Sequence, residues 1–169
     1  MTDSTRQLTG MTIMLYAALK TLHVLSIIIW VGGMAFTLFF LRPAVAALEL
    51  PARVQLMHEI LRKFFKAVLL MALIALLSGG WMMMLYVSQA LQAGGTSRMP
   101  WSWSVMASLG ILMILIFGHI RFVLFKRLGQ ALASQAWTSG GAALASIRVW
   151  VRANLVLGLL TVVLAVAGT

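Results

Sequence analysis

Three histidines are the side chains whose chemistry and placement suggest a binding site. A neutral imidazole commonly ligates copper or haem iron. His23 lies inside an apolar run from Leu22 to Arg42, where an ionisable side chain is costly and therefore a functional candidate. His119 ends another apolar run, and His58 lies in an amphipathic stretch. We take all three as candidate metal ligands; the open alternative is a hydrogen bond to a neighbouring group or, for His58, solvation.

Methionine is the second candidate ligand, because the chain has twelve methionines and no cysteine. Thioether sulfur favours Cu(I) or an axial position on haem iron. Without cysteine, disulfides, iron–sulfur clusters and thiolate metal sites are excluded. Filling of apolar gaps is the alternative role. The methionines expected at the outer side of the membrane are Met11, Met14, Met82, Met83, Met84, Met99 and Met106.

Acidic residues are too few for carboxylate chemistry. The chain has only Asp3, Glu49 and Glu59, and none lies inside an apolar run. Hydrolysis by paired carboxylates and proton pumping through carboxylates are therefore poor interpretations. The sequence also lacks a phosphate-binding loop and a dinucleotide motif. Whether the protein is an enzyme stays open.

The elements that must position these residues are membrane-spanning helices. With 62% hydrophobic and 9% charged residues, the chain cannot coat a soluble globule, so its outer surface must face lipid. Apolar runs predict an all-α polytopic membrane protein, a four-helix bundle forming one domain over residues 1–169, with spans at about 11–41, 65–91, 102–125 and 148–166. An additional amphipathic helix between spans 1 and 2 either lies at the interface or extends the second span. A cleaved signal peptide is disfavoured because the first run is too long.

The distribution of cations predicts the topology. Lys and Arg concentrate in the first and third connections, whereas the second holds only Arg98. By the positive-inside rule, both termini are expected in the periplasm and both basic connections in the cytoplasm, where they would contact anionic inner-leaflet lipid rather than nucleic acid. At 1.5 Å per residue, His23 lies about 28 Å from Arg42 and His119 only about 10 Å from Lys126, so the two should not share one metal ion.

Residues 19–45, LKTLHVLSIIIWVGGMAFTLFFLRPAV, resemble the first helix of CopD-type copper resistance domains. The shared features are the histidine, a tryptophan seven residues later and a Gly-Gly pair. Weaker similarity continues along the chain, at Met57 to Phe65, at Gly118-His119 and at Arg152-Ala153-Asn154.

The same four-helix plan resembles the HemJ-type protoporphyrinogen oxidases, which are b-type haem proteins. That resemblance implies His23, His119 and Asn154 as cofactor-binding positions. The acidic residue that usually follows the asparagine is Leu155 in this chain.

The CopD resemblance implies a protein of the bacterial inner membrane that handles or translocates copper, often with a periplasmic copper-binding partner. In this hypothesis the outer methionines gather Cu(I), with Met82, Met83 and Met84 as the candidate ligands among them. His23 then receives the ion, and His119 and His58 line its exit. A redox protein with haem b is the alternative, and a non-catalytic membrane scaffold is the second alternative. A homo-oligomer is compatible with each of them.

Overall fold

The computed structural model describes residues 3–92 and 100–167, with side chains described from residue 10 onward. Every regular element in these ranges is helical. The elements are α1 (Asp3–Phe36), the π-helical turn η1 (Thr37–Leu41), α2 (Arg42–Val45), α3 (Leu50–Gln92), α4 (Trp101–His119), the π-helical turn η2 (Ile120–Leu124), α5 (Phe125–Ala133) and α6 (Trp137–Ala167).

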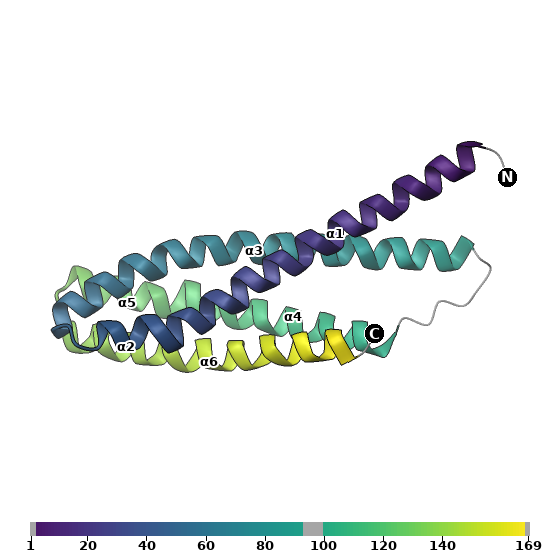
Figure 1. Ribbon diagram of the computed structural model, residues 1–169. Helices are drawn as coiled ribbons and strands as arrows, with labels where there is room; N and C mark the ends of the chain where they lie inside the picture. The colour runs from purple at the N-terminus through teal and green to yellow at the C-terminus, as the bar shows by residue number, and fades with distance from the viewer. Residues whose placement is uncertain (1–2, 93–99, 168–169) are drawn as a thin grey trace.

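Four helical rods in the described ranges are long and apolar enough to cross a membrane: Gly10–Val45, Leu50–Gln92, Trp101–Ala133 and Trp137–Ala167. They confirm the predicted all-α polytopic fold. The first rod packs mainly on α3, and α4 and α5 pack on α6 (Figure 1). α1 begins and α6 ends at the same end of the molecule, while α2 and α5 lie at the other end (Figure 1).

The helices extend further than the predicted spans. α3 has 43 residues, about 65 Å at 1.5 Å per residue, roughly twice the hydrocarbon thickness of a bilayer. Its amphipathic part, around Arg53 to Phe64, is continuous with the apolar part because no proline or turn signal separates them. There is thus no separate amphipathic helix within α3; the stretch extends the second span. Likewise, α6 begins at Trp137, whereas the fourth span was predicted to begin at about residue 148, after a connection that ends at residue 147.

Aromatic side chains hold the rods together where α4 passes through η2 into α5. The Trp30 and Phe117 rings meet edge to face with centroids 6.1 Å apart. Phe65 meets Phe117 at 5.9 Å and Phe125 at 5.3 Å, again edge to face. Such edge contacts are favourable beyond the burial of apolar area. All four residues are buried, so this cluster joins α1, α3, α4 and α5 and fixes their relative register.

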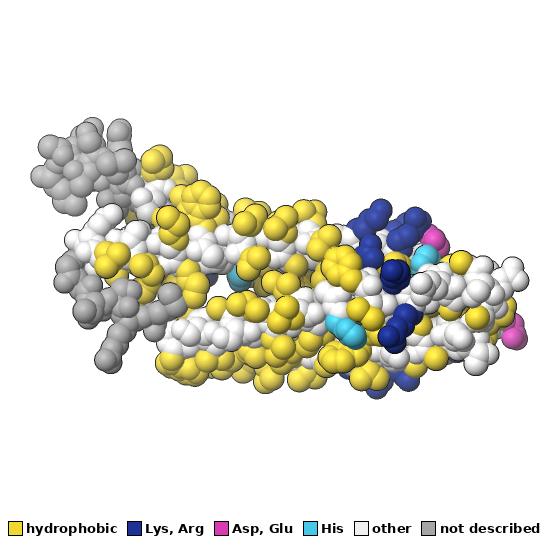
Figure 2. All heavy atoms as spheres, turned by 180° about the vertical axis from the view of Figure 1, so that it is seen from behind, with side chains coloured by type: hydrophobic (Ala, Val, Ile, Leu, Met, Phe, Trp, Pro, Cys, Tyr) yellow, Lys and Arg dark blue, Asp and Glu magenta, His cyan; other side chains and the backbone are white. Residues whose placement is uncertain are grey.

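Lys and Arg side chains gather near one end of the molecule, as a band visible in Figure 2. We call the end that holds α2, the N-terminal part of α3 and α5 the basic end; its cations are Arg42, Arg53, Arg62, Lys63, Lys66, Arg121, Lys126, Arg127, Arg148 and Arg152. Both π-helical turns lie at this end, since η1 directly precedes Arg42 and η2 contains Arg121. Wide turns of this kind change the direction of the side chains that follow and are frequent at functional sites.

Candidate functional site

His23 is held between α1 and α3. Its Nδ1 lies 2.9 Å from the carbonyl oxygen of Ala75 and 3.2 Å from Oγ of Ser78. The Ser78 hydroxyl itself donates to the carbonyl of Ile74. A main-chain carbonyl only accepts hydrogen bonds, so Nδ1 must carry the proton that binds Ala75. The neutral ring then leaves the lone pair of Nε2 available.

A histidine tethered in this way is prepared for metal binding. In metal sites, the ligating histidine usually donates its other N–H to a carbonyl or carboxylate, which fixes the tautomer and the ring orientation. His23 shows this arrangement, with a half-buried side chain. The sequence indicated the histidine but not its tether, because a main-chain carbonyl carries no sequence signal. The Ser78-Gly79-Gly80 stretch is the one local signal that could have indicated it.

Gly79 allows the close approach of the imidazole. A Cβ atom at this position would lie 3.1 Å from Cε1 and 3.3 Å from Nδ1 of His23, which is tighter than ordinary van der Waals contact. At the adjacent Gly80, a Cβ atom would meet nothing within 4 Å. The ring therefore packs directly over the Gly79 backbone, and α3 offers it a surface without a side chain.

Two methionines extend this surface by one helical turn. Met82 and Met83 follow Ser78 and Gly79 by four residues, and residues four apart lie on one face of an α-helix. Both are half-buried. Met84 is rotated by a further 100° and is 73% exposed, so it does not share this face. The run of three methionines thus contributes two thioethers on the side of α3 that holds the imidazole.

The other methionines predicted at this end are less well placed for a site. Met11 and Met14 are 65% and 75% exposed, as expected for lipid-facing side chains. Met106 is half-buried on α4. Met99 lies outside the described residues. Gap filling and lipid contact account for Met11, Met14 and Met106 without a metal.

His119 does not point into the bundle. Its side chain is exposed on α4, and its ring lies against Trp150 of α6, with centroids 5.0 Å apart. His23, by contrast, contacts α3. The two imidazoles thus lie against different helix pairs, and no contact joins them among the described residues. This geometry does not fit one haem held by both histidines.

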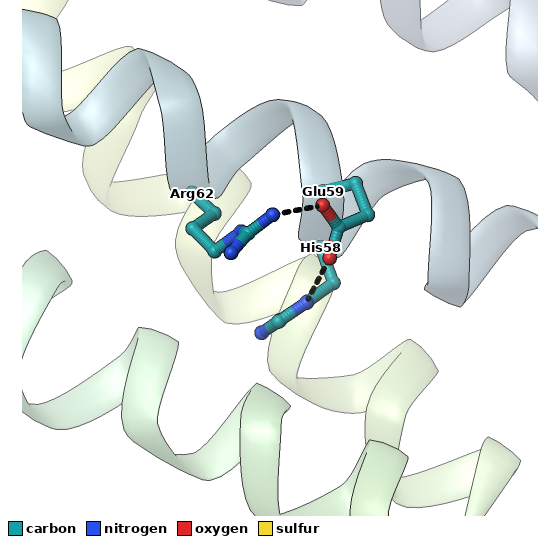
Figure 3. A network of polar contacts seen from close by, with 3 residues as sticks. All are labelled: His58, Glu59 and Arg62. Atoms are coloured by element: carbon teal, nitrogen blue, oxygen red, sulfur yellow. Dashed lines mark hydrogen bonds and ion pairs between the residues drawn. The ribbon is translucent and has the colours of Figure 1, made fainter.

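His58 has a packing role at the basic end. Its ring stacks on Phe125 of α5, with centroids 4.9 Å apart and planes 4° from parallel. Its Nδ1 lies 3.7 Å from Oε1 of Glu59, while Oε2 of the same carboxylate accepts a 2.6 Å hydrogen bond from Nη2 of Arg62 (Figure 3). Seventeen residues of α3 separate His58 from Ala75, about 26 Å along the helix, so His58 and His23 are far apart.

Asn154 is almost completely buried on α6, with 1% of its surface exposed. Its Oδ1 is buried without a hydrogen-bond partner among the described residues. Within these residues, no three His, Asp or Glu side chains come together as a metal-binding group. The predicted ligands are therefore dispersed. His23 contacts the middle part of α3, Met82 and Met83 follow further along α3, His58 lies at the basic end, and His119 and Asn154 lie on α4 and α6.

These features define a class of protein: a multi-pass membrane protein with a four-rod helical bundle and a histidine tethered between two of the rods. A family model described as copper resistance protein D matches residues 58–168, about two thirds of the chain. The chain thus belongs to the copper resistance protein D family. Neither the curated proteins nor the solved structures include a match to it.

The family match confirms the predicted family on the part of the chain where the resemblance was weaker. It begins at His58 and leaves out residues 19–45, the stretch that carried most of the resemblance. It includes Met82, Met83, His119 and Asn154, whereas His23 lies outside it. The family description concerns copper and adds nothing in favour of haem.

Proposed function

We propose that this protein handles copper by binding Cu(I), as cargo, at Nε2 of His23 with the thioethers of Met82 and Met83. The observation that carries the proposal is the Nδ1–H tether of His23 to Ala75, which leaves the lone pair of Nε2 free. The ring packs over Gly79, and Met83 follows Gly79 by one helical turn on α3. Imidazole nitrogen and thioether sulfur both suit Cu(I). Neither the neutral imidazole nor the thioether has to lose a proton before it binds the ion. Membership in a copper resistance family supports copper as the cargo.

The proposed orientation places this site toward the periplasm. Ten of the thirteen Lys and Arg residues lie at the basic end, and positive charge favours the cytoplasmic side of an inner membrane. In this orientation both chain termini are periplasmic. A periplasmic copper-binding protein is then the natural partner for exchange at the His23 end.

The test is Cu(I) affinity of the detergent-purified protein, measured by competition with a chromophoric Cu(I) chelator. His23→Ala should weaken binding by more than the roughly 10–100-fold that loss of an outer partner of a metal ligand costs. His119→Ala is the matched control, because it removes an imidazole from an exposed position. The control variant should retain the affinity of the unaltered protein.

The same two variants should differ in cells. Copper accumulation should change on His23→Ala and not on His119→Ala, provided that both proteins insert in the membrane in equal amounts. Unaltered affinity and accumulation in His23→Ala would refute the proposed site. A loss that is equal in both variants would point to a different arrangement of ligands.

A further inference from the structure

Four arginines line one pocket at the basic end. The pocket has a volume of about 310 Å³ and lies between the end of the first rod, α3 and α6. Its cationic residues are Arg42 after η1, Arg53 near the start of α3, and Arg148 and Arg152 one turn apart on α6. Arginines from three separate rods therefore converge on one space, a convergence that the positions of these residues in the sequence do not reveal.

No carboxylate balances this charge within the described residues. The salt bridges found there join Glu59 to His58 and Arg62, and none involves an arginine of the pocket. Nε of Arg148 is buried and finds no hydrogen-bond partner in the part of the chain that the structure describes. Like charges in one partly buried pocket repel one another, and a buried unpaired N–H of a charged group is costly. The arrangement is thus incomplete without an anion.

The geometry of the pocket also suits a particular kind of anion. The Arg53 guanidinium is oriented by hydrogen bonds from Nε and Nη2 to the carbonyl of Leu48, at 3.3 and 2.9 Å. Planar guanidinium groups match the oxygens of phosphate in pairs of parallel hydrogen bonds. The volume far exceeds the roughly 30 Å³ that one water molecule takes in the liquid, so a phosphate group fits. Apolar side chains complete the lining: Leu38, Val45, Met57 and Leu144.

We propose that the pocket formed by Arg42, Arg53, Arg148 and Arg152 binds the phosphate group of an anion. The source is either the headgroup of an anionic phospholipid or free phosphate, since both present the same oxygens. The apolar lining and the position at the end of the first rod suit a lipid, whose chains could continue along the bundle. This site is separate from the proposed copper site, so either proposal can fail without the other.

The experiment uses the full chain in phosphatidylcholine nanodiscs. One arm titrates inorganic phosphate against chloride at equal ionic strength, and the other replaces part of the phosphatidylcholine by phosphatidylglycerol. The shift in the thermal unfolding midpoint reports binding, because a ligand of the folded state stabilises it. Native mass spectrometry in detergent counts retained phosphatidylglycerol.

Arg148→Gln is the test variant, and Arg127→Gln is the control because it removes the same charge from an exposed position outside the pocket. Loss of one charge-assisted contact should weaken anion binding at least about tenfold in Arg148→Gln only. Without any anion, Arg148→Gln should unfold at a higher temperature than the unaltered chain, because repulsion is relieved. Arg152→Gln, at an exposed position on the pocket rim, serves if Arg148→Gln does not fold.

Each outcome decides the proposal. A shift of the unfolding midpoint with phosphatidylglycerol alone assigns the pocket to lipid, and a shift with inorganic phosphate alone assigns it to free phosphate. Either result supports the proposal if Arg148→Gln loses the shift. No shift with either probe would overturn it. Equal weakening in Arg127→Gln and Arg148→Gln would also overturn it, because diffuse surface charge would then explain the binding.

Discussion

Replacing Gly79 with alanine tests whether the tether of His23 matters for copper. The added Cβ would lie 3.1 Å from Cε1 and 3.3 Å from Nδ1 of the imidazole. To restore ordinary contact the ring must retreat by about 0.3 Å, which would lengthen the 2.9 Å Nδ1–Ala75 hydrogen bond to about 3.2 Å, the upper end of the usual range. The fold should tolerate so small a shift.

The magnitude follows from the role of the tether. Loss of an outer hydrogen-bond partner typically costs about 10–100-fold in metal affinity. Because Gly79→Ala lengthens the hydrogen bond without removing it, we expect the lower end of this range, about a tenfold weakening of Cu(I) binding. A larger loss would be expected only if the ring rotates away from α3.

The assay is the same chelator competition, with Gly80→Ala as the matched control. Both substitutions add one methyl group to neighbouring positions of α3, and both gain up to about 1 kcal/mol in helix propensity. At Gly80 the methyl group meets nothing within 4 Å. The control should therefore bind Cu(I) as the unaltered protein does.

Unchanged Cu(I) affinity in Gly79→Ala, together with a strong loss in His23→Ala, would refute the reasoning about the tether while preserving the histidine as a ligand. Equal weakening in the two glycine variants would show that the effect comes from the helix and not from contact with the imidazole.

Two further predictions concern stability in detergent. Asn154→Leu should raise the thermal unfolding midpoint, because it removes a buried side-chain carbonyl oxygen that has no hydrogen-bond partner among the described residues, a defect worth about 1–3 kcal/mol. A lower midpoint would show that this side chain is stabilised where it lies. Gly140→Ala should lower the unfolding midpoint, with a loss of about 1–3 kcal/mol in the free energy of unfolding, because its Cβ would lie 2.9 Å from Cγ1 of the stiff, fully buried Val54. Gly110→Ala is the control, because a Cβ there would meet nothing within 4 Å. Equal midpoints in the two variants would contradict this packing.

The sequence was sufficient to predict the membrane fold. Hydrocarbon thickness sets the length of each apolar run, and the membrane interior requires helices, so four spans follow from local composition alone. Helix ends were harder to predict, because a helix can continue beyond an apolar run without any change in its hydrogen bonding. The stretch before the second span and residues 137–147 both continue their helices in this way.

The candidate site was only partly predictable. His23 could be found because an ionisable residue is costly within an apolar run. His119 met the same criterion, yet the structure places it on the exterior beside Trp150. The sequence offered three consecutive methionines as ligands, Met82, Met83 and Met84. Because each residue of an α-helix is rotated by 100° from the one before, Met84 turns away from the face that Met82 and Met83 share.

Composition and periodicity by themselves determined the class of fold, the four spans, the concentration of cations and the residue types available for copper. Only the tertiary structure decided which of these residues act together. The His23 tether joins residues 52 positions apart, and the arginine pocket brings Arg42 and Arg53 together with Arg148 and Arg152 from the other half of the sequence. Such pairings depend on the register in which whole helices pack, which arises from many side chains at once and leaves no local pattern to be read.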